Sequence, residues 1–246
     1  MAEIYRPPLA NPTAGGLYGA ATVKDTGEPS RLAQGIQVET WNCGPSWVWP
    51  IACDAELPDP SPKGAQPRND WTDLEFTGDV VGADDNCSAL VDEEEAAQRA
   101  QQLLRLQESR RVEEELVPRL LTFAGAPTTV AGLVAAVGGL EESIAPFGFP
   151  GVLHAAPHLA AALQAAQLIT RSGTYLLSPL GHRWAFGAGY AGLAETIVAT
   201  GPVVVHRGPV VMNHGPNYPK NQRLSVAERE VLVTWECWTE AVTIGA

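Results

Sequence analysis

The sequence has 246 residues, and its 28 acidic residues outnumber its 16 basic residues, so the formal net charge is −12. This balance excludes a protein that holds nucleic acid by neutralising many phosphates, because each such contact needs a Lys or an Arg. Hydrophobic residues make up 45% of the chain, which excludes a disordered acidic protein, and charged residues make up 18%, which indicates that further copies of the protein cover part of its surface.

The chain is long enough for one large domain or two small ones with a sizeable core. Its most apolar stretch, residues 155–169, is too short for a transmembrane helix and contains polar residues, so we expect no contact with a membrane. Residues 1–12 lack the basic region and apolar run of a secretory signal, and we expect the chain to stay in the cytosol where it is made.

Residues 1–91 have many prolines and glycines and no helical periodicity, which predicts extended segments and loops. Residues 35–45 and 46–57 are predicted as two strands that face each other across a Gly44-Pro45 turn, and residues 69–81 as a third extended piece. This region holds four tryptophans, Trp41, Trp47, Trp49 and Trp71. They either bury against a neighbouring subunit or form a local cluster that closes the hairpin.

A long helix is predicted from Asp92, where Asp92 and Glu95 form a start signal. Apolar residues then follow one face with helical spacing, and the predicted length is about 40 Å at 1.5 Å per residue. We expect Pro118 to bend or end this helix. The charged group Glu113 to Glu115 is expected on a solvated or intersubunit face. Residues from 124 on are compact α/β in pattern, and the last segments are rich in Val, Thr, Ile and Trp, as strands are.

Motifs for catalysis, metals or nucleotide cofactors are absent from the sequence. His154 and His158 have the i, i+4 spacing of zinc ligands, but Pro157 interrupts the helical face that they would share. A nucleophilic site at Cys43 has no local signature. We therefore predict no catalytic residue, no metal site and no cofactor, with buried or surface histidines as the expected alternative.

Read in order, the chain has an arm, a Trp-rich hairpin, a long helix, an α/β body and closing strands. This order resembles the major capsid protein of tailed double-stranded DNA phages, which has the Hong Kong 97-type fold that encapsulins share. Stretches most like actinobacterial-phage capsid proteins are GLYGAATV (16–23), EEEAAQRAQQLLRLQESRRVEEEL (93–116), TTVAGLVAAVGGLEESIAPFGFPGVLHAAPHLAAAL (128–163), RSGTYLLSPLGHRWAFGAGY (171–190) and AEREVLVTWECWTEAVTI (227–244).

The resemblance implies an α+β fold. Residues 1–34 match the N-terminal arm, 35–91 the extended loop and the start of the peripheral domain, 92–123 the spine helix, 124–200 the axial domain, and 201–246 the closing strands of the peripheral domain. The loop tryptophans Trp41, Trp47, Trp49 and Trp71 would then contact a neighbouring subunit.

The resemblance also implies a function, namely an icosahedral shell around phage genomic DNA. The partners would be further copies in hexamers and pentamers, scaffolding, portal or decoration proteins, and DNA by weak contact. The shell would be part of the virion and would assemble in the cytoplasm of a host bacterium. The alternatives are an encapsulin compartment, and a cytosolic hydrolase or metal-binding enzyme that uses Cys43, His154 or His182.

The four cysteines, Cys43, Cys53, Cys87 and Cys237, are too few and too widely spaced for a disulfide scaffold or a paired zinc motif, and buried free thiols are the simplest interpretation. A further hypothesis pairs Cys43 with Cys53, because they face each other across the predicted hairpin, and Cys87 with Cys237. Both bonds would form after release from the cell.

Overall fold

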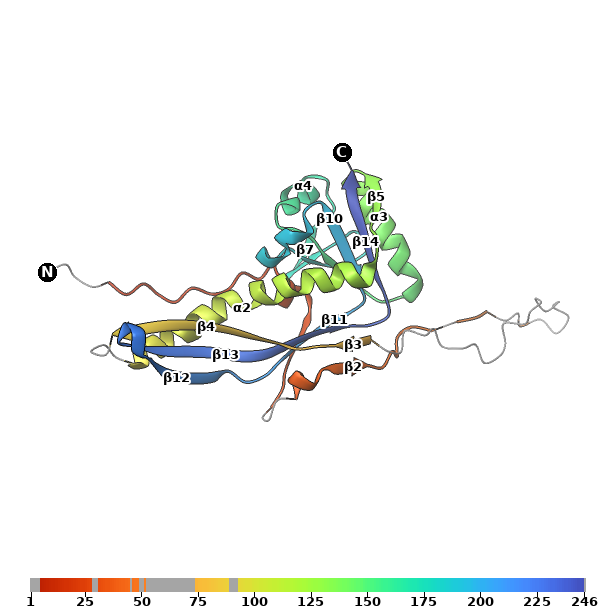
Figure 1. Ribbon diagram of the computed structural model, residues 1–246. Coiled ribbons are helices and arrows are strands. Elements are labelled where there is room, and N and C mark those ends of the chain that lie inside the picture. Colours follow the sequence, from red (N-terminus) through yellow and green to blue (C-terminus); the bar gives the residue numbers. More distant parts are fainter. Residues whose placement is uncertain are drawn as a thin grey trace.

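The structure is a computed structural model that describes residues 5–27, 31–44, 46–48, 51, 74–88 and 93–245. One long helix, α2 (Glu93–Ala124), lies along a first sheet, and a second sheet with helices α3 (Leu133–Ile144) and α4 (Leu159–Ala165) sits over one end of α2 (Figure 1). The described helices include none that is long and apolar enough to cross a membrane.

Helix α2 has 32 residues, and its buried side chains recur at helical spacing. Ala96, Ala100 and Leu104 follow one another at four-residue intervals, and all three are buried. Three acidic residues in the first turn complement the helix dipole. The helix does not end at Pro118 but continues to Ala124, because Leu116 and Leu120 on either side of the proline are anchored in the core.

The first sheet is built around the 14-residue strand β13 (Gln222–Trp235). Strand β4 (Asp79–Ser88) pairs with it in antiparallel register along one edge. Strands β12 (Val211–Asn217) and β11 (Val203–Arg207) share the other edge, and β1 (Thr22–Asp25) runs parallel to β11. Helix α2 packs on β4 and β13, so the apolar face of the helix and that of the sheet bury each other.

The second sheet has seven strands. Their order is β5 (Thr128–Ala131), β14 (Thr239–Gly245), β10 (Thr196–Thr200), β6 (Val152–His154), β9 (Arg183–Ala185), β8 (Tyr175–Leu177) and β7 (Thr170–Ser172). Helix α3 packs against β14, and its buried residues join a second apolar core. The expected grouping of residues 201–246 is wrong for β14, because this strand pairs with β5 and β10 and not with the first sheet.

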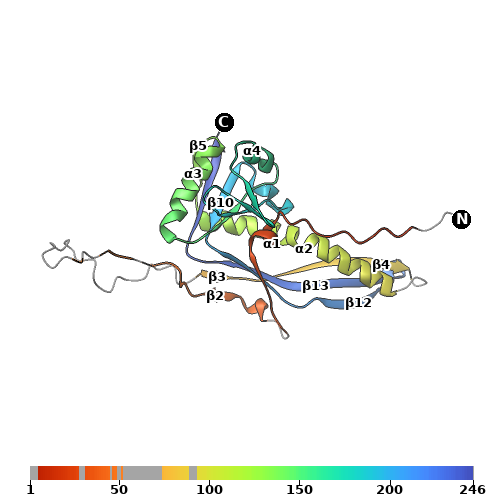
Figure 2. The same cartoon turned by 180° about the vertical axis from the view of Figure 1, so that it is seen from behind.

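A small two-stranded sheet joins β2 (Ile36–Val38) to β3 (Leu74–Phe76) in antiparallel register. We call residues 36–44 and 74–76 the loop root, because they lie on either side of the segment predicted as the extended loop (Figures 1 and 2). The predicted hairpin of residues 35–45 with 46–57 is not found among the described residues: the partner of β2 is β3, and residues 46–48 and 51 are not in a strand. Residues 49–50 and 52–57 of the predicted second strand lie outside the described residues.

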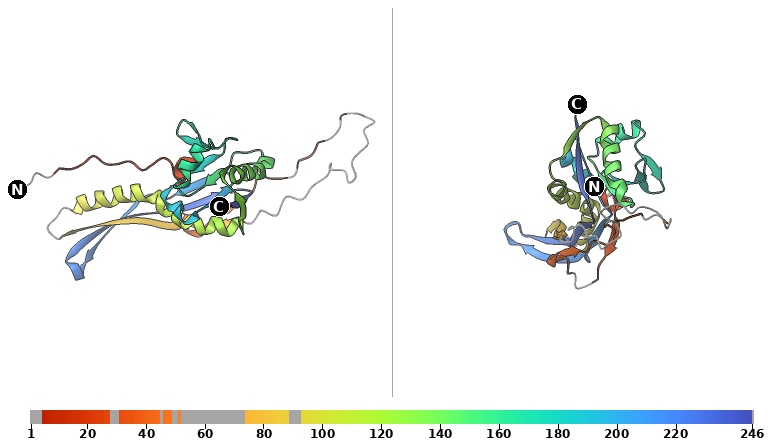
Figure 3. Two further views of the ribbon diagram at one scale, coloured as in Figure 1. Left: turned by 90° about the horizontal axis from the view of Figure 1, so that it is seen from above. Right: turned by 90° about the vertical axis from the view of Figure 1, so that its right-hand side faces the viewer.

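The N-terminal segment, residues 5–13, is extended and follows α2 in the direction opposite to the loop root (Figure 3). Gln102 Nε2 donates to the carbonyl of Ala10 at 2.8 Å, and Arg6 pairs with Glu95 at 3.1 Å. The short helix α1 (Leu17–Ala20) then enters the core between α2 and the second sheet. The remaining helical turns are of the 3₁₀ type: Leu32–Gln34, Ala145–Phe147, η3 (Ala188–Leu193) and η4 (Tyr218–Lys220).

Candidate assembly site

The loop root and the segment after it carry apolar side chains that the chain itself leaves exposed. Trp41 is 74% exposed and Trp47 is 48% exposed. Val48 and Ile51 are also among the exposed large hydrophobic residues. Adjacent apolar side chains of this kind are typical of a surface that another protein covers. Trp49 and Trp71, which belong to the same prediction, lie outside the described residues, as does Cys53.

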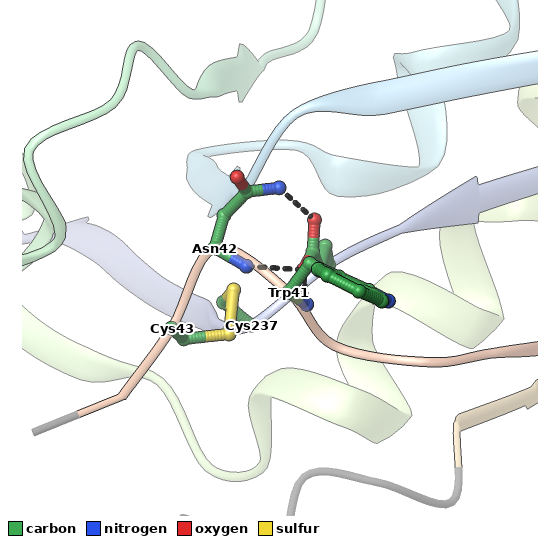
Figure 4. Close-up of a disulfide and its surroundings, with 5 residues drawn as sticks. Trp41, Asn42, Cys43 and Cys237 are labelled. Atoms are coloured by element: carbon green, nitrogen blue, oxygen red, sulfur yellow. Dashed lines mark hydrogen bonds between the residues drawn. A yellow bond between two sulfur atoms is a disulfide. The ribbon is translucent and has the colours of Figure 1, made fainter.

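The loop root is attached to the body by a disulfide between Cys43 and Cys237 (Figure 4). The two Cα atoms are 5.7 Å apart, although the residues are 194 positions apart in sequence. Cys237 lies in the corner that connects β13 to β14, and thus connects the first sheet to the second. The bond therefore joins the loop root to the junction of the two sheets.

Both hypothetical cysteine pairings are wrong. Cys43 is bonded to Cys237, so it does not pair with Cys53, which lies outside the described residues. Cys87 lies opposite Arg223 near the start of β13, whereas Cys237 follows the other end of that strand. Arg223 is twelve residues of strand from Trp235, the last residue of β13, which is roughly 40 Å at 3.3 Å per residue. A disulfide needs Cα atoms within about 7 Å.

Glu236, the residue before Cys237, holds the same segment through its carboxylate. Oε1 accepts the backbone N–H of Asn42 at 2.8 Å and that of Trp41, and Oε2 accepts the side-chain amide of Asn42 at 2.6 Å. Glu236, Cys43 and Cys237 are also the one group of potential metal ligands found among the described residues. Since the two sulfurs are bonded to each other and the carboxylate accepts three N–H groups, this group is a structural clamp.

The corner itself has an unusual backbone. Cys237 has φ of 75°, in the left-handed region, which costs a non-glycine residue on the order of 1–3 kcal/mol. The Gly201 N–H donates to the Trp238 carbonyl at 3.0 Å. A Cβ atom on Gly201 would lie 1.9 Å from the carbonyl oxygen of Glu236. The corner can therefore pack against Gly201 only because glycine has no side chain.

A buried chain of hydrogen bonds leads from η3 to Gly201. The Thr200 hydroxyl donates to the Gly201 carbonyl, so its oxygen accepts from His154 Nε2 at 3.1 Å. His154 Nδ1 then accepts from the Tyr190 hydroxyl at 2.8 Å. Burial lowers the pKa of His154 from 6.5 to about 3, so the ring is neutral and serves as a structural core residue.

Glu113 connects helix α1 to η3, where this chain of hydrogen bonds begins. Its carboxylate accepts the backbone N–H of Leu17 at 2.8 Å, the N–H of Gly189 at 3.1 Å and the Ser109 hydroxyl at 3.0 Å. Burial raises the pKa of the Glu113 carboxyl, although the hydrogen bonds from Leu17 and Gly189 act in the opposite direction.

The expectation that Glu113 lies on a solvated or intersubunit face is thus wrong within this chain. Glu113 shares the inward face of α2 with Val112 and Leu116 and is 1% exposed, whereas Glu115 is exposed. The glycines at positions 16 and 187 are a sequence signal for the burial of Glu113 that sequence reasoning missed. A Cβ atom at either position would collide with the Glu113 carboxylate.

His182 does not form a catalytic set. Ser178 Oγ donates to Glu141 at 2.5 Å, and it accepts the backbone N–H of His182. The His182 ring instead accepts the N–H of Gly151 through Nδ1 at 3.0 Å, and burial lowers its pKa. Catalysis would need the His182 ring to hydrogen-bond the Ser178 hydroxyl and be oriented by the acid, so these residues hold a turn in place.

No family model matches the sequence, and no curated protein matches it either. Solved structures do match. The capsid of a native GTA particle aligns over 100% of this chain and 94% of its own, with 14% identity and a TM-score of 0.59. The Mycobacterium phage Adephagia structure aligns over 100% and 95%, with 15% identity and a TM-score of 0.55. The SrpI encapsulin of Synechococcus elongatus PCC 7942 aligns over 70% and 75%, with 13% identity and a TM-score of 0.52.

These alignments, together with the arm, the long helix and the two sheets, define the class: the chain has the fold of viral capsid and encapsulin shells. In particular it has the Hong Kong 97-type fold, and the α+β prediction is confirmed.

Proposed function

We propose that this protein is the major capsid protein of a tailed double-stranded DNA phage and assembles into an icosahedral shell around the phage genome. The observation that carries the proposal is the agreement of fold, over 99% of the chain or more, with the mature capsid of bacteriophage PhiM1 and the capsid of a GTA particle. The chain also places its N-terminal segment and its loop root on opposite sides of the body, where each can reach a different neighbour.

The proposed partners are further copies of the chain, arranged in hexamers and pentamers. The exposed side chains of Trp41 and Trp47 would be buried by the adjacent subunit, and Trp49 and Trp71 are proposed for the same contact. Scaffolding, portal and decoration proteins are proposed as further partners, because a phage shell needs a size control and an entrance for its DNA.

The charge of the chain agrees with a container wall. A net charge of −12 favours weak contact with packaged DNA, since like charges repel. The shell would be part of the virion and would be assembled in the cytoplasm of a bacterial host. An encapsulin compartment is the second candidate, but the SrpI encapsulin aligns with 70% of the chain, against 100% for the phage and GTA capsids cited above. A hydrolase or metal enzyme is disfavoured by the structural roles of Cys43, His154 and His182.

The test is expression of the chain alone and together with its genomic neighbours. Size exclusion and electron microscopy should show capsomers or closed particles, and a stable monomer under every condition would contradict the proposal. Particle contents separate the two shells: packaged DNA with terminase and portal genes nearby supports the phage capsid, and an enclosed enzyme encoded nearby supports the compartment.

A further inference from the structure

We propose that Cys43 and Cys237 are a redox-controlled lock, which is open as two thiols while the chain folds and assembles and is closed by oxidation afterwards. The timing rests on the proposed function, since a capsid leaves a reducing cytoplasm for oxidising surroundings. The chemistry of the pair rests on the geometry of this chain alone.

The position of the bond gives it a specific effect. Strand β2 has no sheet partner beyond β3 among the described residues, and residues 39–44 after it are in no strand. The bond ties the loop root to the corner after Trp235, where the two sheets meet. Because it closes a segment of 194 positions, it removes a large amount of freedom from the open chain.

The two sulfurs are held near each other without the bond. Glu236 accepts hydrogen bonds from Trp41 and Asn42 on one side of Cys43, and Thr40 is 2% exposed. Cys237 is fixed by the corner that seats on Gly201. Reduction therefore leaves a preorganised dithiol, and the lock can close without a search through many conformations.

The exposure of the two residues sets the order of reaction. Cys237 is completely buried, whereas Cys43 is partly buried and lies beside the exposed residues Asn42 and Gly44. A small-molecule disulfide, such as oxidised glutathione, is the oxidant. The Cys43 thiolate attacks one of its sulfurs, forms a mixed disulfide and releases one small thiolate.

The Cys237 thiolate then attacks the Cys43 sulfur and displaces the second small thiolate. Two electrons pass to the oxidant, which becomes two thiols, and the protons of both protein thiols go to solvent or to the leaving thiolates. In excess reduced glutathione the same steps run backwards, so the state of the lock follows the surroundings of the particle.

The experiment uses particles, or capsomers if these form, purified under reducing conditions without oxygen. Samples are treated with oxidised glutathione, unfolded with a thiol-blocking maleimide and mapped by peptide mass spectrometry. We expect reduced Cys43 and Cys237 before treatment and a Cys43–Cys237 cross-linked peptide after it. The midpoint of dissociation in urea should rise on oxidation.

The double variant Cys43→Ser with Cys237→Ser should lose this rise, and Cys43→Ser alone should lose it while leaving the buried Cys237 in place. Cys87→Ser is the matched control, because it removes a cysteine from β4 that lies opposite the far end of β13, and it should keep the full rise. A different cysteine pairing, thiols that stay reduced in oxidised glutathione, or an equal rise in the double variant would overturn the lock.

Failure of the proposed function gives a different result. If the chain never assembles, the mapping is done on the soluble protein, and a Cys43–Cys237 peptide there supports the lock while the capsid proposal fails. Particles that assemble but never form this peptide give the opposite result.

Discussion

The backbone N–H of Leu17 donates a 2.8 Å hydrogen bond to the carboxylate of Glu113, 96 positions later in the chain. The same carboxylate accepts the N–H of Gly189, so one side chain of α2 holds both the start of α1 and the 3₁₀ turn η3, which precedes β10. From Tyr190, the residue after Gly189, hydrogen bonds lead through His154 and Thr200 to Gly201, which contacts the corner that carries Cys237. Helix α1 and the corner that holds the loop root are thus connected through one buried polar path.

Replacement of Glu113 tests this path. Glu113→Ala leaves two buried N–H groups without an acceptor, which should lower the free energy of unfolding by about 2–4 kcal/mol. Glu113→Gln keeps one acceptor oxygen and should recover much of that loss. Urea unfolding of the unassembled protein measures both values. The exposed Glu115→Gln is the control, and equal stability of Glu113→Ala and the wild type would contradict the role of Glu113.

The pH dependence of Glu113 has a defined sign. Its pKa is raised in the folded protein above the ordinary value of 4.5, so the folded state binds its proton more tightly than the unfolded state. This contribution is fully present below pH 4.5 and is lost as the pH rises through the folded pKa. The difference in free energy of unfolding between the wild type and Glu113→Gln should therefore fall as the pH rises from 4.5 through the folded pKa of Glu113, and it should be constant at higher pH.

His154 gives the opposite dependence. Its pKa falls from 6.5 to about 3 on folding, so its contribution is fully present above pH 6.5 and is lost as the pH falls toward 3. The total loss is on the order of 5 kcal/mol, at 1.36 kcal/mol per pH unit. His154→Gln should flatten the acid limb of the stability curve. An unchanged acid limb in His154→Gln would argue against this assignment.

Gly201→Ala should damage the corner between the sheets. The added Cβ would lie 1.9 Å from the Glu236 carbonyl oxygen, so the backbone must move, at a cost of about 3 kcal/mol. Gly138→Ala is the matched control, because that helical site on α3 has nothing within 4 Å and the change should stabilise by about 0.5–1 kcal/mol. Thermal unfolding of the two variants should shift in opposite directions, and a shift in the same direction would exclude the steric argument.

Trp41→Ala should separate folding from assembly. Since Trp41 is 74% exposed in the single chain, its loss should change the free energy of unfolding by less than about 1 kcal/mol. Burial on a neighbour would make its loss costly, by about 2 kcal/mol or more per contact, and the concentration needed for assembly should rise at least tenfold. Light scattering measures that concentration. Tyr218→Ala, on η4, serves as an exposed aromatic control, and normal assembly of Trp41→Ala would refute the contact.

Much of the fold could be predicted from local pattern and family resemblance. The spacing of Ala96, Ala100 and Leu104 predicts α2, and the long alternation around Val231 predicts β13. Two features could not be found in this way. The partner of β2 is β3, which follows 36 residues later. A local reading pairs residues 35–45 with residues 46–57 instead, and it therefore misses Cys237 as the partner of Cys43. Glu113 stands in a charged run, and its burial depends on which face of α2 meets α1.

The position of β14 has a consequence for synthesis on the ribosome. In the second sheet, β14 lies between β5 and β10, yet it is translated after every other described strand. Strand β5 pairs with β14 alone among the described strands, so it stays unpaired until residue 245 has emerged. A nascent chain that stops before β14 therefore lacks an interior strand of the second sheet and cannot complete that sheet. In the proposed shell, prematurely terminated copies would be excluded from a growing particle by their own incomplete folding.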